Sequence, residues 1–221
     1  MNERRWERHA PLAGVLAVAL WLIGILIVEG VGNPPNDDVT GQEAVAYYDD
    51  DSNSILAGSL IWALGTLAFI WFLGSLRSAL HRAEGGVGRV ASIAFAAGIA
   101  VAIFSLCLFA PDLAGAITMG VEDTTLEGAA AQALHSLGDG FFVLAEYTAA
   151  LLLAATALVA LRTGILPRWL AWVSLLIAVV LLIPPIGWAG LIFAFPLWII
   201  AVSYLLWREP ALDEAEVRPA I

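Results

Sequence analysis

Long runs of apolar residues, separated by short polar segments, constrain this chain more than any other feature of its sequence. Residues 12–28 form one continuous apolar run, and five further runs of similar character follow it. A helix needs about 20 apolar residues to cross the roughly 30 Å hydrocarbon core of a bilayer. The chain is also 61% hydrophobic and 14% charged, whereas soluble domains carry about 25% charged residues. The sequence therefore predicts an all-α membrane protein.

The apolar runs predict a single transmembrane domain over residues 1–221, built as a bundle of six helices. The first run resembles a signal peptide, but it is longer than a usual signal core and no small-residue cleavage site follows it, so we expect it to be retained as a span. A charged tail, residues 208–221, is expected after the last span. The expected spans are about 12–28, 54–76, 90–109, 134–161, 169–183 and 188–207.

All ten cationic residues are arginines, and their positions predict the orientation of the helices. Three arginines precede the first expected span, three lie between the second and third, two between the fourth and fifth, and two follow the sixth. Cytoplasmic loops carry an excess of basic residues, so both termini are expected to be cytoplasmic. The net charge of −10 argues against a nucleic-acid partner, because phosphate binding requires clustered basic residues. The lipid bilayer is the expected environment, with a membrane-protein partner or a second copy of the chain as candidates for assembly.

The first outer loop, residues 30–53, is predicted to contain a short helix. Thr40 and Glu43 have the spacing of a capping box, in which each side chain bonds to the backbone of the other residue. The helix is expected over about 41–49, with its two tyrosines at the level of the lipid headgroups.

A second outer loop is expected over residues 110–133, because Pro111 and Asp112 are expected to end the third span. The alanine-rich end of this loop is expected to begin the fourth helix early. Within that span, small residues recur every four positions and allow a neighbouring helix to approach closely. They are Ala94, Gly98 and Ala102.

Four short segments near the expected membrane interfaces have a recognisable pattern. They are AYYDD at 46–50, WFLGSLR at 71–77, RAEGG at 82–86 and RTGILPRWL at 162–170. These segments resemble a widespread group of small six-span membrane proteins of actinobacteria, catalogued as a domain of unknown function. The resemblance extends from the second span to the sixth, and it implies a six-span topology in the bacterial plasma membrane. It implies no activity and no site residue.

Glu146 is the one ionisable residue placed well inside an otherwise apolar run. At 1.5 Å per residue it lies about 24 Å from Arg162, at the expected cytoplasmic edge, and therefore in the outer leaflet. Three polar residues share its helical face at the N-terminal side, at steps of three, four and seven: Gln132, His135 and Asp139. Glu29 and Asp112 end the first and third spans near the outer surface.

These six residues predict a polar site, for which two interpretations remain open. In the first, they form an outward-facing acidic vestibule in which Glu146 holds a proton at rest and exchanges it for a cation. In the second, the outer loops are acidic because arginines are kept inside, and Glu146 is a neutral hydrogen-bonding group between helices. Ala150 and Ala157 share the face of Glu146, which indicates that this face packs against protein.

The sequence lacks the motifs of common catalytic sites. No HExxH or GxSxG motif is present. Cys107 is a single cysteine inside an apolar run, for which a buried packing role is expected. A metal site that uses His135 with Asp139 and Asp112 has no dense ligand motif to support it. We therefore expect no cofactor, no resident metal and no catalytic residue.

Three functions fit these observations, in order of preference. The first is a non-enzymatic structural or accessory bundle of the bacterial plasma membrane. The second is a small transporter or channel for a cation or cationic solute that uses Glu146. The third, an intramembrane enzyme that acts on lipid, rests on the polar face that reaches the outer leaflet.

Overall fold

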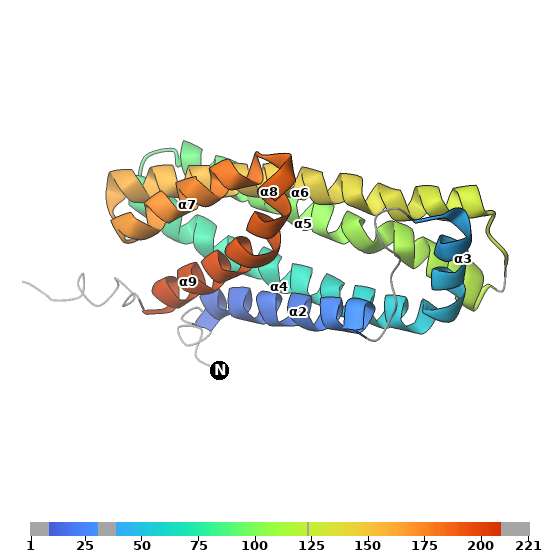
Figure 1. Cartoon of the computed structure of the whole chain (residues 1–221). Helices are drawn as coiled ribbons and strands as arrows, with labels where there is room; N and C mark the ends of the chain where they lie inside the picture. The colour runs from blue at the N-terminus through green and yellow to red at the C-terminus, as the bar shows by residue number, and fades with distance from the viewer. Residues whose placement is uncertain (1–8, 31–38, 123, 209–221) are drawn as a thin grey trace, which may run out of the picture.

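The structure is a computed structural model that describes residues 9–30, 39–122 and 124–208, and every element of secondary structure in these ranges is a helix. Figure 1 shows an elongated bundle in which the long helices run side by side. The expectation of an all-α fold is confirmed. Five helical segments are long and apolar enough to cross a membrane, as in a multi-pass membrane protein: Ala10–Gly30, Ser52–Glu84, Arg89–Val121, Gly128–Thr163 and Pro185–Arg208.

Helices α2 (Ala13–Gly30) and α4 (Ser52–Glu84) form a closely packed antiparallel pair. Glycines make the approach possible, because a Cβ atom on Gly24 would lie only 3.0 Å from the carbonyl oxygen of Gly58. Small residues at a helix interface allow such backbone contact in membrane proteins. A short 3₁₀ helix, η1 (Ala10–Leu12), leads into α2.

The buried centre of the bundle contains a set of hydrogen bonds that links α2, α4 and the next long helix. Trp21 donates its indole N–H to the hydroxyl of Thr66 at 3.1 Å, and the Thr66 hydroxyl lies 3.1 Å from that of Ser105. The indole N–H of Trp62 lies 2.9 Å from both the hydroxyl and the carbonyl oxygen of Ser105. Buried polar side chains need hydrogen-bond partners, so these residues pair with one another between helices.

Helix α3 (Gly41–Asp50) lies across the end of the bundle instead of along it (Figure 1). It begins at the capping box that the sequence predicts. Thr40 accepts a hydrogen bond from the backbone N–H of Glu43, and the Glu43 carboxylate accepts one from the backbone N–H of Thr40 at 2.8 Å. The preceding predicted loop residues, 31–38, lie outside the described ranges.

The predicted outer loop 110–133 is wrong in extent. Helix α5 (Arg89–Ala116) continues through Pro111, and a π-helical segment, η2 (Ile117–Val121), follows it directly. Helix α6 (Gly128–Thr163) begins within the alanine-rich end of the predicted loop, as expected. A proline inside a helix removes one backbone hydrogen bond, but here Pro111, Gly115 and Ala116 are buried where α5 packs against α3 and α6, and this packing favours continuation of the helix.

The predicted small-residue face of α5 lies against α4. Ala94 and Ala102 are both buried, and the side chain of Leu73 from α4 occupies the space beside Gly98. The large side chain of one helix thus fills the gap left by small residues on the other.

The last two predicted spans form a short hairpin. Helix α7 (Arg168–Leu181) has 14 residues, a length of about 21 Å, which is less than the roughly 30 Å of a hydrocarbon core. The chain then turns through α8 (Pro184–Ala189) and a π-helical segment, η3 (Gly190–Ala194), into α9 (Phe195–Arg208). Figure 1 shows α8 near the middle of the bundle. The hairpin therefore extends along only the part of the bundle between its middle and the end opposite α3.

The two ends of the bundle differ in charge. The turns from α4 to α5 and from α6 to α7, and the end of α9, lie at the end opposite α3 (Figure 1). The N-terminal arginines at 4, 5 and 8, and the tail 209–221, lie outside the described ranges. Every arginine within those ranges lies within two helical turns, about 10 Å, of a helix end opposite α3. These arginines are Arg77, Arg82, Arg89, Arg162, Arg168 and Arg208.

Candidate functional site

Asp112 is the centre of a polar cluster at the α3 end of the bundle. Its Oδ1 atom accepts a 2.8 Å hydrogen bond from the hydroxyl of Tyr48, and the Nδ1 atom of His135 lies 3.3 Å from the same oxygen. The side chains of Asp112 and His135 are 18% and 20% exposed. The cluster therefore joins α3, α5 and α6 through one carboxyl group that remains accessible to water.

Close packing of α3 on α5 places Tyr48 in this cluster. The ring of Tyr48 is fully buried and lies flat against Gly115, where an added Cβ would come within 2.7 Å of it. The ring of Tyr47 meets that of His135 edge-on, with 6.0 Å between their centres. Burial raises the pKa of both phenols above the ordinary range, and the charge of Asp112 adds to this effect. Both tyrosines therefore stay neutral, and Tyr48 remains a hydrogen-bond donor.

Gln132 has a related role at the other edge of the cluster. Its side-chain amide donates a 2.8 Å hydrogen bond to the carbonyl oxygen of Val39, just before α3 begins. The contact ties the segment that leads into α3 to α6. Two of the six predicted site residues, Gln132 and His135, therefore hold α3 in place from α6.

Glu29 and Asp139 have exposed side chains at the same end of the molecule. Glu29 lies in the last turn of α2, near enough to Tyr47 for its charge to contribute to the raised pKa of that phenol. Asp139 lies one turn along α6 from His135, as the predicted helical face requires. Asp112, His135 and Gln132 are thus brought together around α3, with Glu29 and Asp139 at the surface nearby.

Glu146 stands apart from this cluster. It lies eleven residues beyond His135 on α6, roughly 16 Å along the helix axis, and its side chain is only 2% exposed. Gly187 of α8 covers it, since a Cβ on Gly187 would lie 2.8 Å from the carboxyl Oε2 atom. That oxygen has no hydrogen-bond partner among the described residues. The predicted face is therefore divided between an exposed part at the end of the bundle and a buried part beneath the α7–α9 hairpin.

The sequence missed Tyr48 as a member of the site, although a signal was present. The capping box fixes where α3 starts, and a helix that starts there has Ala44, Tyr47 and Tyr48 on one face. All three are buried in the structure. The sequence does not show which helix this face meets, because α3 and Asp112 are far apart in the chain.

The described residues offer no ready metal site. Within residues 9–30, 39–122 and 124–208, no group of three or more histidine, cysteine, aspartate or glutamate side chains is placed to hold a metal ion. His135 and Asp112 alone supply too few ligands for the coordination that zinc or calcium requires.

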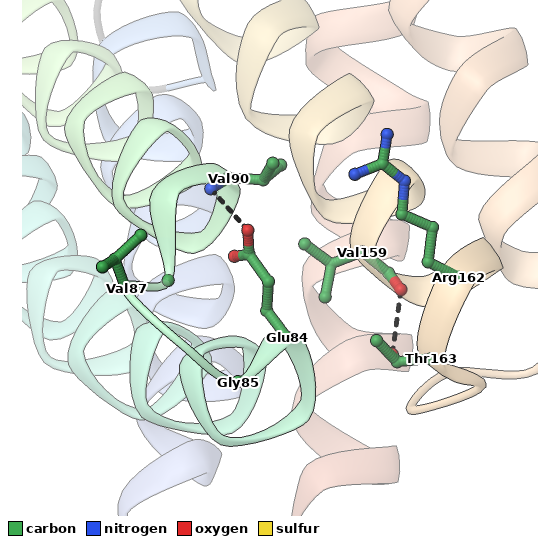
Figure 2. Close-up of a pocket in the computed structure, with 8 residues that line it drawn as sticks. Glu84, Gly85, Val87, Val90, Val159, Arg162 and Thr163 are labelled. Carbon is green, nitrogen blue, oxygen red and sulfur yellow. Dashed lines mark hydrogen bonds between the residues drawn. The ribbon is translucent and has the colours of Figure 1, made fainter.

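A cavity of about 300 Å³ lies at the opposite end of the bundle, where the α4–α5 turn meets the end of α6 (Figure 2). The Glu84 carboxylate forms one wall. It accepts hydrogen bonds from the backbone N–H groups of Val90 at 2.9 Å and Ala91 at 2.8 Å, and so caps the start of α5. Arg162 and Thr163 of α6 form the facing wall, so the cavity contains charges of both signs.

No family model matches this chain, and no curated protein or solved structure is significantly similar to it.

Proposed function

We propose that this chain is an integral membrane protein that acts as a non-enzymatic structural or accessory bundle of the bacterial plasma membrane. The observation that carries the proposal is the use of the polar residues at the α3 end. Tyr48 and His135 both bond to Asp112, and Gln132 bonds to the backbone before α3. These groups attach α3 to the rest of the bundle. The polar side chains that could take part in a reaction therefore have a structural role.

The outer surface of the long helices supports a lipid environment. Large apolar side chains are exposed along α2, α4 and α7, and contiguous exposed apolar surface of this kind marks contact with lipid or another protein. Trp169 and Trp172 at the start of α7 are also exposed, as expected of residues at a membrane interface. The exposed apolar residues include Leu22, Leu26, Leu64, Leu67, Trp71, Leu176 and Val179.

The proposed topology has six membrane-embedded segments with both ends of the chain in the cytoplasm. The described arginines support it because they gather at one end of the bundle. The α7–α9 hairpin supports it too: the indole N–H of Trp198 donates a 2.7 Å hydrogen bond to the hydroxyl of Ser174, and Figure 1 shows both helices extending from α8 toward the end opposite α3. Such a hairpin would return the chain to the side from which it entered, whether or not α7 crosses the whole bilayer. The assignment to a bacterial plasma membrane rests on the resemblance of the interfacial segments to actinobacterial proteins.

An accessory role is tested by gentle extraction of the affinity-tagged protein from its own membrane, followed by identification of the proteins retained. A specific membrane protein in fixed ratio, absent when an unrelated multi-pass protein is extracted in the same way, is the expected result. A protein that is isolated alone and carries a bound substrate would contradict the accessory role.

A second candidate, a cation transporter, is favoured by one observation at Glu146. A buried carboxyl group with an oxygen that lacks a partner is costly inside a protein, and ionisable residues within membrane helices often mark ion pathways. The Oε2 atom of Glu146 has this property among the described residues. Proton and rubidium flux into vesicles that contain the purified protein tests the idea.

The transport experiment needs two variants. Under the transport hypothesis Glu146→Gln abolishes flux, whereas Glu127→Gln, which alters an exposed carboxyl group before α6, leaves it unchanged. The accessory proposal expects no flux above that of empty vesicles with any of the three proteins.

A further inference from the structure

The cavity between the α4–α5 turn and the end of α6 contains two charged groups that the proposed function does not use. We propose that it binds the headgroup of a zwitterionic phospholipid, with the phosphate beside Arg162 and the ammonium beside Glu84. The inference rests on the proposed membrane placement of the bundle but not on its accessory role. The residues that line the cavity are Glu84, Gly85, Val87, Gly88, Val90, Val159, Arg162 and Thr163.

Arg162 provides the anion-binding side of the cavity. Its side chain is exposed, and Figure 2 shows it extending along α6 with Val159 between it and Glu84. Among the described residues no hydrogen bond or ion pair within 4.0 Å engages its guanidinium group. A guanidinium has five N–H donors in a planar fork that matches two phosphate oxygens. The group is therefore available to a phosphate.

Glu84 provides the cation-binding side. Its two bonds to the backbone of α5 fix the carboxylate at the cavity wall. A carboxylate can accept about four hydrogen bonds, so acceptor sites remain for an ammonium group. Because the backbone bonds already hold the side chain, a ligand gains this contact without having to order it.

The position of the cavity favours a lipid over a soluble ligand. Val87, in the α4–α5 turn, is 90% exposed, and Leu158 is an exposed apolar residue about 6 Å along α6 from Arg162. The cavity therefore borders the apolar band of the bundle on one side and the arginine-rich turns on the other. Lipid headgroups lie at this boundary in a bilayer.

The opposite charges select among lipids. Glu84 repels the phosphate of an anionic lipid that has no ammonium group, and Arg162 repels a simple cation. A headgroup that carries both charges satisfies both side chains. Phosphatidylethanolamine has a phosphate and a primary ammonium in this arrangement, and its N–H groups can donate to the carboxylate.

The proposal is tested by measuring which lipids remain bound to the protein purified in mild detergent. The protein is given equal amounts of phosphatidylethanolamine and phosphatidylglycerol, and bound lipid is counted by native mass spectrometry. A preference for phosphatidylethanolamine is expected. Equal retention, or a preference for phosphatidylglycerol, would overturn the proposal.

Variants locate the site. Arg162→Gln is expected to weaken phosphatidylethanolamine binding by about tenfold, since it removes a charge-assisted hydrogen bond. Arg168→Gln is the matched control, because Arg168 is an exposed arginine at the same end that does not line the cavity. Equal losses in the two variants would place the lipid elsewhere.

For Glu84→Gln the total amount of bound lipid is not a sufficient measure, because the substitution also weakens the cap of α5. The quantity of interest is the ratio of the two lipids bound, which is expected to shift toward phosphatidylglycerol. An unchanged ratio would contradict the role of Glu84. Soluble glycerophosphoethanolamine is the further control, and displacement of the lipid by an equal concentration of it would assign the site to a free phosphate compound. Failure of all these lipid tests would leave the accessory role standing, since that role is measured by the proteins retained.

Discussion

Tyr48 is the residue on which the attachment of α3 most depends. Its hydroxyl donates to Asp112 and its ring fills the space above Gly115. Tyr48→Phe keeps the ring but leaves a partly buried carboxyl oxygen without that donor. We expect the variant to lose about 1–3 kcal/mol of stability, measured by thermal unfolding in detergent, and to exchange the amide hydrogens of α3 faster.

The matched control is Tyr147→Phe, which removes a hydroxyl from a tyrosine of α6 that is 41% exposed. It is expected to change stability by less than about 0.5 kcal/mol. If both variants exchange the α3 amides at the rate of the parent protein, the hydrogen bond to Asp112 does not hold α3.

Glu146 allows a second test at this scale. One of its buried carboxyl oxygens has no partner among the described residues, so an apolar side chain of similar volume should fit at little cost. Glu146→Met is expected to keep the stability within about 1.5 kcal/mol of the parent protein. A loss above about 3 kcal/mol in thermal unfolding would mean that the carboxyl group contributes to packing in a way that the geometry does not indicate.

Gly187→Leu is the companion variant. A Cβ on Gly187 already falls within 2.9 Å of both carboxyl oxygens of Glu146, so a larger side chain must displace α8 or Glu146. It is expected to destabilise the protein by about 1–3 kcal/mol. Glu146→Met tests whether the carboxyl group is needed for stability, and Gly187→Leu tests whether the contact needs a residue without a side chain.

Helix α3 depends on its capping box for its start. The backbone N–H and hydroxyl of Thr40 both donate to Glu43, and these bonds lower the pKa of that carboxyl group from its ordinary value. Because the pKa is lower in the folded state, this contribution to stability is present above the unfolded-state pKa and is lost as the pH falls through the folded-state value. We expect the amide hydrogens of α3 to lose protection as the pH falls through the acidic range in which the Glu43 carboxyl group becomes protonated, in native-state exchange after correction for intrinsic rates.

Glu43→Gln provides the control for this pH dependence. Glutamine also forms a capping box but does not titrate, so the variant should retain α3 and lose the acid-dependent part of the exchange. An identical pH profile in the two proteins would assign the effect to another carboxyl group.

The element boundaries show what can be read from a sequence and what cannot. The start of α3 was predictable because a capping box is a local signal. The end of α5 was not, because Pro111 locally favours a break, and packing of Gly115 and Ala116 against α3 and α6 offsets it. The length of α7 also depends on tertiary structure, because the helix ends where the chain turns into α8.

The candidate site was predictable in part for a similar reason. Helical periodicity predicted one face for Gln132, His135 and Asp139, and all three lie on the continuous helix α6. The same face also included Glu146, but residues on one face differ in depth, and the α7–α9 hairpin covers the deeper part. The partnership of Tyr48 with Asp112 joins residues 64 positions apart, so no local pattern could reveal it.

For the whole molecule, the central claim is that the bundle crosses a bilayer with its arginine-rich turns inside and α3 outside. The α3 end carries acidic residues and none of the described arginines, whereas the opposite end carries all of the described arginines. Under the proposed topology, the arginine-rich end and the cavity beside Arg162 face the cytoplasm, and α3 faces the opposite side of the membrane.

The most direct test is the accessibility of single cysteines in intact cells, in a Cys107→Ala background. Gln42→Cys places a thiol on exposed α3, and Val87→Cys and Thr163→Cys place thiols in the α4–α5 turn and at the end of α6. We expect a membrane-impermeant thiol reagent to label position 42 in intact cells, and to label positions 87 and 163 only after the membrane is opened. Labelling of position 42 together with position 87 or 163 in intact cells would contradict it.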